Sequence, residues 1–240
     1  MDNPILVQKT TTAVQPDKRS SGHEDLDVFL NGGYDSDIIT TLYGPSGAGK
    51  TTLCLLALIH AVRAKKKVIY IDTEASFSVE RLMQIAPTDY AAILQHTLFL
   101  RPMGFADQQK AFDKLCKLVD GSIGLIVVDT ISMLYRLEIG QTNDIYNVNK
   151  KLGGQLAALS EIARREKVPV LVVNQVYANF EDKDKVNMVG GDILRYSSKT
   201  LLELQVFAQG HRAVTVRKSR SLPEGKTFSF KLVQSGIEKR

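Results

Sequence analysis

A glycine-rich octapeptide, GPSGAGKT at residues 44–51, constrains the fold of this chain more than any other feature. It matches the phosphate-binding loop pattern G-x-x-x-x-G-K-[ST], with both glycines, the lysine and the threonine in place. The loop follows an expected buried strand, Asp37 to Tyr43, and precedes an expected helix, Lys50 to Ala64. Because this strand, loop and helix order is the arrangement in which such a loop binds phosphate, the sequence predicts a nucleotide site in an α/β fold.

The residue types of this loop suit ATP and Mg²⁺. Glycines let backbone N–H groups point inward, and the helix N-terminus adds a partial positive charge. Lys50 is expected to neutralise the β- and γ-phosphates, and the hydroxyl of Thr51 to bind Mg²⁺. The residues predicted to contact the nucleotide here are Gly44, Pro45, Ser46, Gly47, Ala48, Gly49, Lys50, Thr51 and Thr52.

Two carboxylates follow apolar strands. LIVVD, residues 125–129, places Asp129 at the carboxyl edge of the sheet, where it is expected to orient the magnesium ion. Glu74, just past the expected strand 67–72, is the candidate that accepts a proton from the attacking water. A solvated strand-end carboxylate is the alternative for Glu74. Since Asp72 and Glu74 alternate along the chain, only one of them is expected to face the nucleotide.

Apolar strands alternate with helical patterns along the rest of the chain. Further strands are expected at 98–100, 124–129 and 169–174, and helices at 79–85, at about 106–119 and in a segment that ends near Glu166. The apolar face of that last helix is predicted to comprise Val148, Leu152, Leu156, Leu159, Ile162 and Ala163. Continuous apolar strands separated by helices indicate a mostly parallel sheet covered by helices on both faces.

The C-terminal part has a different pattern. LLELQVF and HRAVTVR predict a hairpin that turns at Gln209 and Gly210, and residues 227–232 predict one more strand, so antiparallel strands are expected here. The chain lacks an internal linker rich in Pro, Gly or Ser. We therefore expect a single α/β domain over residues 21–240, preceded by a flexible polar arm over residues 1–20.

Composition and charge exclude several classes. With 44% hydrophobic and 24% charged residues the chain is typical of a globular protein, and it contains neither a run of about 18 apolar residues nor a signal-peptide pattern. A cytoplasmic protein without membrane contact is therefore expected. The net charge of +5 is uneven, because residues 195–240 contain ten Lys or Arg against three acids. This excess favours an anionic partner such as nucleic acid, with a solvated face as the alternative.

Six stretches together resemble the RecA superfamily, specifically the ATPase core of archaeal and eukaryotic recombinases, and within it a short archaeal paralogue. They are GPSGAGKTTL, YIDTEASFSVERL, LIVVDTIS, VPVLVVNQV, VGGDILRYSSKT and LPEG, spread over nearly the whole chain. The resemblance implies a RecA-like fold and specific roles. Glu74 matches the catalytic glutamate that acts beside Lys50, and Gln175 matches the residue that senses the γ-phosphate and relays the ATP state to DNA.

The same resemblance assigns contacts to adenine. Arg81 matches an arginine that stacks on the base, a contact that suits a planar guanidinium, and an ordinary exposed helix residue is its alternative. Pro223 in LPEG matches a proline that packs on the adenine of a neighbouring subunit, and a simple turn proline is its alternative.

The resemblance also implies two DNA-binding loops, at about residues 136–147 and 177–191, with Arg136 as a candidate phosphate contact. The second loop carries FEDKDK, whose three acids weaken its attraction for DNA. The basic cluster Arg217, Lys218 and Arg220 is an alternative DNA surface. Its position near Pro223 leaves open a second role, in which these residues reach the γ-phosphate of a neighbour.

Two features of the recombinase pattern are missing from this sequence. The residues before Ser21 are too few for the N-terminal DNA-capturing domain, and the first phenylalanine, Phe29, is expected inside the core instead of in a linker that tethers filaments. We therefore expect an accessory protein of recombination and repair with weak ATP hydrolysis. Its expected partners are single-stranded or branched DNA and the main RecA-family recombinase.

Two other functions stay open at this point. One is a self-sufficient, DNA-stimulated ATPase that forms filaments and exchanges strands, and the other is a regulatory ATPase of RecA fold that acts on protein partners only. Homo-oligomer formation is also left open.

Overall fold

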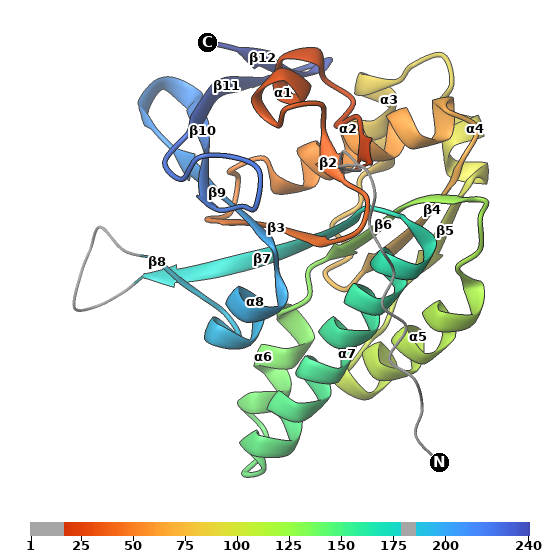
Figure 1. Ribbon diagram of the computed structural model, residues 1–240, viewed down its shortest axis with the longest axis vertical. Coiled ribbons are helices and arrows are strands. Elements are labelled where there is room, and N and C mark those ends of the chain that lie inside the picture. Colours follow the sequence, from red (N-terminus) through yellow and green to blue (C-terminus); the bar gives the residue numbers. More distant parts are fainter. Residues whose placement is uncertain (1–16, 179–185) are drawn as a thin grey trace, which may run out of the picture.

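A mostly parallel β-sheet forms the centre of the molecule in the computed structural model, which describes residues 17–178 and 186–240 (Figure 1). The parallel strands run in the order β9, β3, β7, β6, β4 and β5. Their bounds are β3 (Ile39–Gly44), β4 (Lys67–Asp72), β5 (Thr97–Leu100), β6 (Ile123–Asp129), β7 (Val170–Ala178) and β9 (Thr200–Val206). The expected parallel sheet is confirmed.

Antiparallel strands extend this sheet beyond β9, as predicted. They are β10 (His211–Lys218), β11 (Thr227–Val233) and β12 (Gly236–Lys239), each paired with the strand before it. The β9–β10 hairpin turns through the 3₁₀ segment Ala208–Gly210, where Gln209 and Gly210 have φ angles of 58° and 74°. The short strand β8 (Val186–Met188) pairs antiparallel with β7.

Helices cover both faces of the sheet (Figure 1). On one face lie α1 (Glu24–Phe29), α2 (Lys50–Arg63), α3 (Val79–Ile85) and α4 (Tyr90–Gln95). On the other lie α5 (Phe105–Leu118), α6 (Met133–Ile139), α7 (Ile145–Glu166) and α8 (Gly191–Ser197). Among the described helices, none combines the length and the apolar composition needed to cross a membrane.

Strand alternation explains why the sheet has two apolar faces. In β4, Val68 and Tyr70 pack into the core under α2, whereas Ile69 and Ile71 pack into the core under α7. Because side chains alternate along a strand, a continuous apolar run serves both layers. The predicted apolar face of α7 is likewise buried at all six positions.

A small N-terminal hairpin precedes the main sheet. Strand β1 (Lys18–Arg19) pairs antiparallel with β2 (Tyr34–Asp35), so the ordered fold includes residues just before Ser21. The close approach requires glycine at position 33, where a Cβ atom would lie 2.1 Å from the carbonyl oxygen of Arg19. Residues 1–16 of the expected arm lie outside the described residues.

Candidate nucleotide-binding site

A cavity of about 260 Å³ opens at the carboxyl ends of β3, β4, β6 and β7. This is the edge at which open α/β sheets bind ligands. Residues from the phosphate loop, the two predicted strand ends and the end of β7 meet here. The cavity is lined by Ser46, Gly47, Gly49, Lys50, Thr51, Thr52, Glu74, Ser76, Asp129, Thr130, Gln175 and Leu232.

The phosphate loop has the backbone conformation that its glycines permit. Gly44 has a φ of 152°, and a Cβ atom there would lie 2.2 Å from the carbonyl oxygen of Leu204; Gly49, with a φ of 99°, precedes α2. Lys50 is only 8% exposed, and its Nζ donates to the carbonyl oxygens of Gly44 (2.8 Å) and Pro45 (2.7 Å). Burial lowers the pKa of Lys50, while Asp129 and Glu74 oppose that shift. The loop thus encloses a cation beside two carboxylates.

Asp129 is a buried carboxylate that collects hydroxyl donors. The hydroxyls of Thr51 and Tyr70 each donate to its Oδ2 at 2.8 Å, and that of Ser76 donates at 3.4 Å. Its side chain is 2% exposed, and burial raises its pKa although the hydrogen bonds from Thr51 and Tyr70 lower it. The carboxylate of Asp129 and the hydroxyl of Thr51 therefore meet at the cavity, and both are oxygen donors of the kind that Mg²⁺ prefers.

Glu74 faces the same cavity and is held by the end of β7. The Nε2 of Gln175 donates to both carboxylate oxygens of Glu74, at 2.7 and 2.9 Å, and the hydroxyl of Thr130 donates to Oε1 at 2.8 Å. Asp72 instead accepts from the backbone N–H groups of Ser76 and Phe77. Glu74 lines the cavity and Asp72 does not, in agreement with the expected alternation.

Several contributors to the site were not predicted. Tyr70 lies in the middle of β4 and reads as an ordinary core residue, although its hydroxyl contacts Asp129. Thr130 directly follows Asp129 and Ser76 lies two residues after Glu74, and this closeness to the predicted acids is a signal that could have identified both. Leu232 comes from β11, far along the chain, and no local sequence pattern points to it.

The C-terminal strands reach the phosphate loop. Arg212 on β10 donates from Nε to the carbonyl oxygen of Gly47 at 3.0 Å. A Cβ atom on Gly49 would lie 3.2 Å from the Cδ2 atom of Leu232, so the loop packs directly against β11. The loop is therefore supported from both the parallel and the antiparallel parts of the sheet.

Arg81 and Pro223, the two residues assigned to adenine, lie outside the cavity lining. The guanidinium of Arg81 donates to the carbonyl oxygens of Val233 (2.8 Å), Gln234 (3.1 Å) and Gly236 (3.1 Å), which form the β11–β12 turn. Pro223 is exposed in the segment between β10 and β11. Their contacts with a base stay predictions.

The basic cluster predicted near Pro223 has partners within the chain. Arg217 forms an ion pair with Glu203, and Nζ of Lys218 donates to the carbonyl oxygens of Arg195 (2.7 Å) and Ser198 (2.8 Å). Arg220 binds the carboxylate of Asp37 with two N–H groups. The charges of Arg217 and Arg220 are therefore compensated locally, and their contact with DNA stays a prediction.

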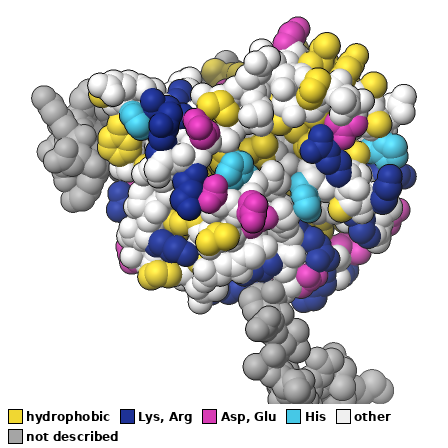
Figure 2. Space-filling model, turned by 90° about the horizontal axis from the view of Figure 1, so that it is seen from above, with side chains coloured by type: hydrophobic (Ala, Val, Ile, Leu, Met, Phe, Trp, Pro, Cys, Tyr) yellow, Lys and Arg dark blue, Asp and Glu magenta, His cyan; other side chains and the backbone are white. Residues whose placement is uncertain are grey.

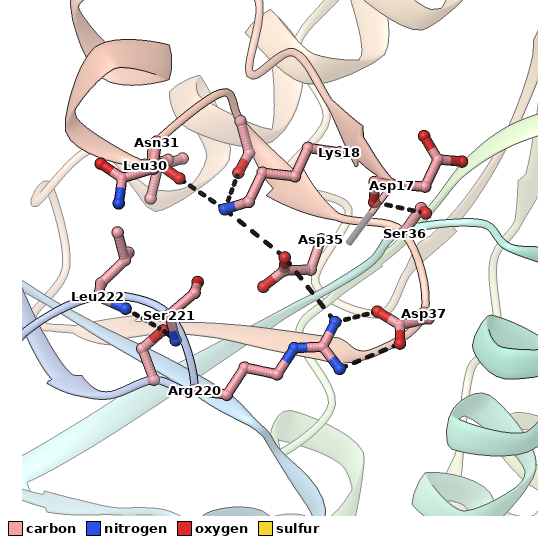
Figure 3. A network of polar contacts seen from close by, with 12 residues as sticks. Asp17, Lys18, Leu30, Asn31, Asp35, Ser36, Asp37, Arg220, Ser221 and Leu222 are labelled. Carbon is pink, nitrogen blue, oxygen red and sulfur yellow. Dashed lines mark hydrogen bonds and ion pairs between the residues drawn. The ribbon is translucent and has the colours of Figure 1, made fainter. Parts of the chain in front are cut away.

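A wider polar network includes Arg220 (Figure 3). Its guanidinium also lies 3.8 Å from the buried carboxylate of Asp35, which lies 3.5 Å from Nζ of Lys18. Lys18 in turn donates to the carbonyl oxygen of Leu30 at 2.7 Å. The network joins the β1–β2 hairpin to the segment that follows β10.

The remaining DNA candidates are less constrained. Arg136 is exposed on α6, within the first expected DNA loop. In the second, the FEDKDK stretch lies outside the described residues. Figure 2 shows Lys and Arg side chains interspersed with Asp and Glu on the face seen from above, so the basic excess forms no single block on that face.

The fold and site define a P-loop α/β protein with a RecA-like core. A match to the Rad51 family model over residues 18–240 establishes the family, and the chain belongs to the Rad51 family. A "DNA repair and recombination protein RadB" from Methanococcus maripaludis strain C5 is 37% identical over 217 residues, which is 89% of this chain and 96% of the relative. A protein of the same description from Methanobrevibacter smithii is 35% identical over 218 residues, 88% of this chain and 92% of the relative.

A solved structure agrees with these relatives. The structure described as "Crystal structure of the RadB recombinase" matches with a TM-score of 0.78 and 34% identity, and the match covers 92% of this chain and 99% of that one. The resemblance to the recombinase core and the predicted fold class are thereby confirmed.

Proposed function

We propose that this protein binds ATP and DNA and assists the main recombinase in homologous recombination and DNA repair, with slow ATP hydrolysis. Membership in the Rad51 family and relatives described as DNA repair and recombination proteins support this role. One observation carries the proposal: Lys50, Thr51, Asp129, Glu74 and Gln175, from four separate strands or loops, converge on one cavity.

ATP binding follows from the phosphate loop. Nζ of Lys50 donates to the carbonyl oxygens of Gly44 and Pro45, and phosphate oxygens would be stronger acceptors for it because they are charged. Thr51 and Asp129 fit a magnesium ion, since they bring a hydroxyl and a carboxylate oxygen together at the cavity. When bound, Mg²⁺ supplies positive charge that neutralises the phosphate oxygens.

Slow hydrolysis is supported by the state of Glu74. A general base needs a free lone pair on an oxygen within hydrogen-bond reach of the attacking water. Both oxygens of Glu74 already accept from Gln175, and one also accepts from Thr130. These three bonds leave about one of the roughly four acceptor positions of the carboxylate for the attacking water. The water therefore competes with Gln175 for Glu74, and Gln175 lies on β7, which leads into the second expected DNA loop.

An assisting role is favoured over a self-sufficient filament by the basic cluster near Pro223. Residues that reach across to the phosphates of a neighbouring subunit need free charge. Arg217 and Arg220 are paired with Glu203 and Asp37 of the same chain. The DNA partner is proposed to be single-stranded or branched, with Arg136 as one phosphate contact.

The experiment combines nucleotide binding, hydrolysis and sedimentation. We expect a fluorescent ATP analogue to bind in the presence of Mg²⁺, ATP turnover to be slow and raised by single-stranded DNA, and the particle to stay small with ATP and DNA. Absence of nucleotide binding would refute the site. Fast sedimentation as long filaments would instead identify a self-sufficient recombinase.

A further inference from the structure

A second basic surface lies where α8 ends and β9 begins. Arg195 and Lys199 are both exposed there, and within residues 17–178 and 186–240 neither has a hydrogen bond or an ion pair from its side chain. Lys218 lies beside them, because its Nζ donates to the carbonyl oxygen of Arg195 and it pairs with Leu201 across the β9–β10 ladder. These residues, together with Tyr196, are called the α8 basic surface.

The charges on this surface repel each other. Lys218 is affected by the positive charges of both Arg195 and Lys199, and these lower its pKa further after partial burial has lowered it. Among the described residues, Lys218 forms no ion pair with a carboxylate. A group of cations without counter-charge costs free energy in the isolated protein, and a bound anion would offset that cost.

Lys218 has a structural part in this arrangement. Its ammonium bonds the carbonyl oxygens of Arg195 and Ser198, at the end of α8, where helix carbonyls lack partners within the helix. It therefore fixes the end of α8 and the position of the two free cations. The side chains of Arg195 and Lys199 are therefore available to bind a ligand from solvent.

The exposed ring of Tyr196 indicates which class of anion this surface binds. Its side chain is 74% exposed, and among the described aromatic residues it contacts no other ring. An exposed aromatic ring that lies between two cations in the sequence is suited to unpaired bases, which stack on the ring while their phosphates contact the positive charges. Paired bases in a duplex do not offer their faces in this way.

We propose that Arg195 and Lys199 bind the phosphates, and Tyr196 stacks on a base, of single-stranded nucleic acid, with Lys218 as the positioning residue. This inference rests on the proposed DNA binding and assigns its direct contacts to Arg195, Tyr196 and Lys199, which the sequence did not single out as DNA contacts; Lys218, predicted there to bind DNA, becomes a positioning residue. It also replaces Arg217 and Arg220, which are paired within the chain, with two cations that are free.

The test measures binding of a labelled single-stranded oligothymidylate by fluorescence anisotropy, from about 50 to about 200 mM salt. For Arg195→Gln with Lys199→Gln, we expect the negative slope of log K against log salt to become shallower by about 1.4, since each lost charge contributes about 0.7 to its magnitude on single strands. Near 0.1 M salt the same loss corresponds to about 10- to 30-fold weaker binding.

Tyr196 gives an independent readout. Tyr196→Ala should weaken binding about fivefold or more with little change in the salt slope, and Tyr196→Phe should retain binding because the ring still stacks. The matched control is Lys114→Gln with Lys117→Gln on α5, which removes two exposed charges from another part of the molecule and should leave the slope nearly unchanged.

The outcomes separate the two proposals. If the unmodified protein does not bind the oligonucleotide at low salt, the proposed DNA binding is wrong. If it binds, but the Arg195 and Lys199 double variant binds with the same affinity and slope, the assignment of this surface is wrong while DNA binding stands. Loss of binding to a polyglutamate peptide, with DNA binding intact, would assign the surface to an acidic protein and overturn the proposal.

Discussion

Tyr70→Phe tests how the buried carboxylate of Asp129 is stabilised. The substitution removes one hydroxyl oxygen and leaves the ring, which packs edge-on against Phe77 at a centroid distance of 5.2 Å. It therefore isolates the hydrogen bond of 2.8 Å from Tyr70 to Asp129. Because phenylalanine retains the aromatic ring of Tyr70, the substitution leaves no ring-sized cavity in the core.

The expected loss follows from the environment of that bond. A hydrogen bond to a charged group contributes about 1.5–3 kcal/mol, and we expect the lower half of this range because Thr51 still donates to the same oxygen. For a chain of this length, 1 kcal/mol corresponds to about 2–4 °C, so the melting temperature should fall by about 3–9 °C.

The loss should depend on pH in a defined direction. Burial raises the pKa of Asp129 above its ordinary value, so the charged form destabilises the folded state and the hydrogen bonds reduce that cost. Removal of the Tyr70 hydroxyl raises this pKa further. The penalty should be full at pH values above the folded pKa and shrink as the pH falls through it, where the carboxyl becomes protonated.

Thermal unfolding followed by circular dichroism at several pH values measures this effect. The control is Tyr90→Phe, since the Tyr90 hydroxyl, in the described part of the chain, has no hydrogen-bond partner; its melting temperature should hardly change. Equal melting temperatures for Tyr70→Phe and the unmodified protein at neutral pH would refute the reasoning.

Three further predictions concern the site and its supports. Lys50→Ala should abolish binding of a fluorescent ATP analogue, because no other described cation lines the cavity; retained affinity would contradict this. Glu74→Gln should keep that binding and lose ATP turnover, and normal phosphate release would show that another group is the base. Asp37→Asn and Arg220→Gln should show a coupling of about 0.5–1 kcal/mol in a double-mutant cycle of urea unfolding, as for an exposed pair. Burial alone would raise the pKa of Asp37, but Arg220 lowers it. The coupling free energy of the Asp37–Arg220 pair should therefore be present at neutral pH and be lost as the pH falls through the pKa of Asp37 in the folded protein. A coupling that does not change with pH would contradict this prediction.

Local patterns in the sequence were sufficient for the centre of the fold. The predicted boundaries of α3, at 79–85, and of β4, at 67–72, agree with the structure at both ends. These segments combine strong periodicity with polar residues at their limits, and Ser78 caps α3 by accepting from the backbone N–H of Arg81. Motif order also indicated that Lys50, Asp129 and Glu74 lie together, because the carboxyl ends of parallel strands share one edge.

Local sequence patterns could not predict the short strands or the contacts between residues far apart in the chain. Strand β12 and the β1–β2 hairpin have four residues or fewer per strand, too few for a periodicity to register. The partner of a long side chain is not encoded locally either. Arg81 was predicted to face a base, and its guanidinium contacts the β11–β12 turn, more than 150 residues away along the chain.

The contacts of the phosphate loop with β10 and β11 have a thermodynamic consequence. Arg212 on Gly47 and Leu232 beside Gly49 make the last strands part of the wall around the ligand, although they lie outside the parallel sheet. A nucleotide that binds only the folded site therefore stabilises those strands by mass action. Their amide protons should exchange with solvent more slowly when ATP is present, so that occupancy of a site built near residue 50 is reported by the last strands of the chain.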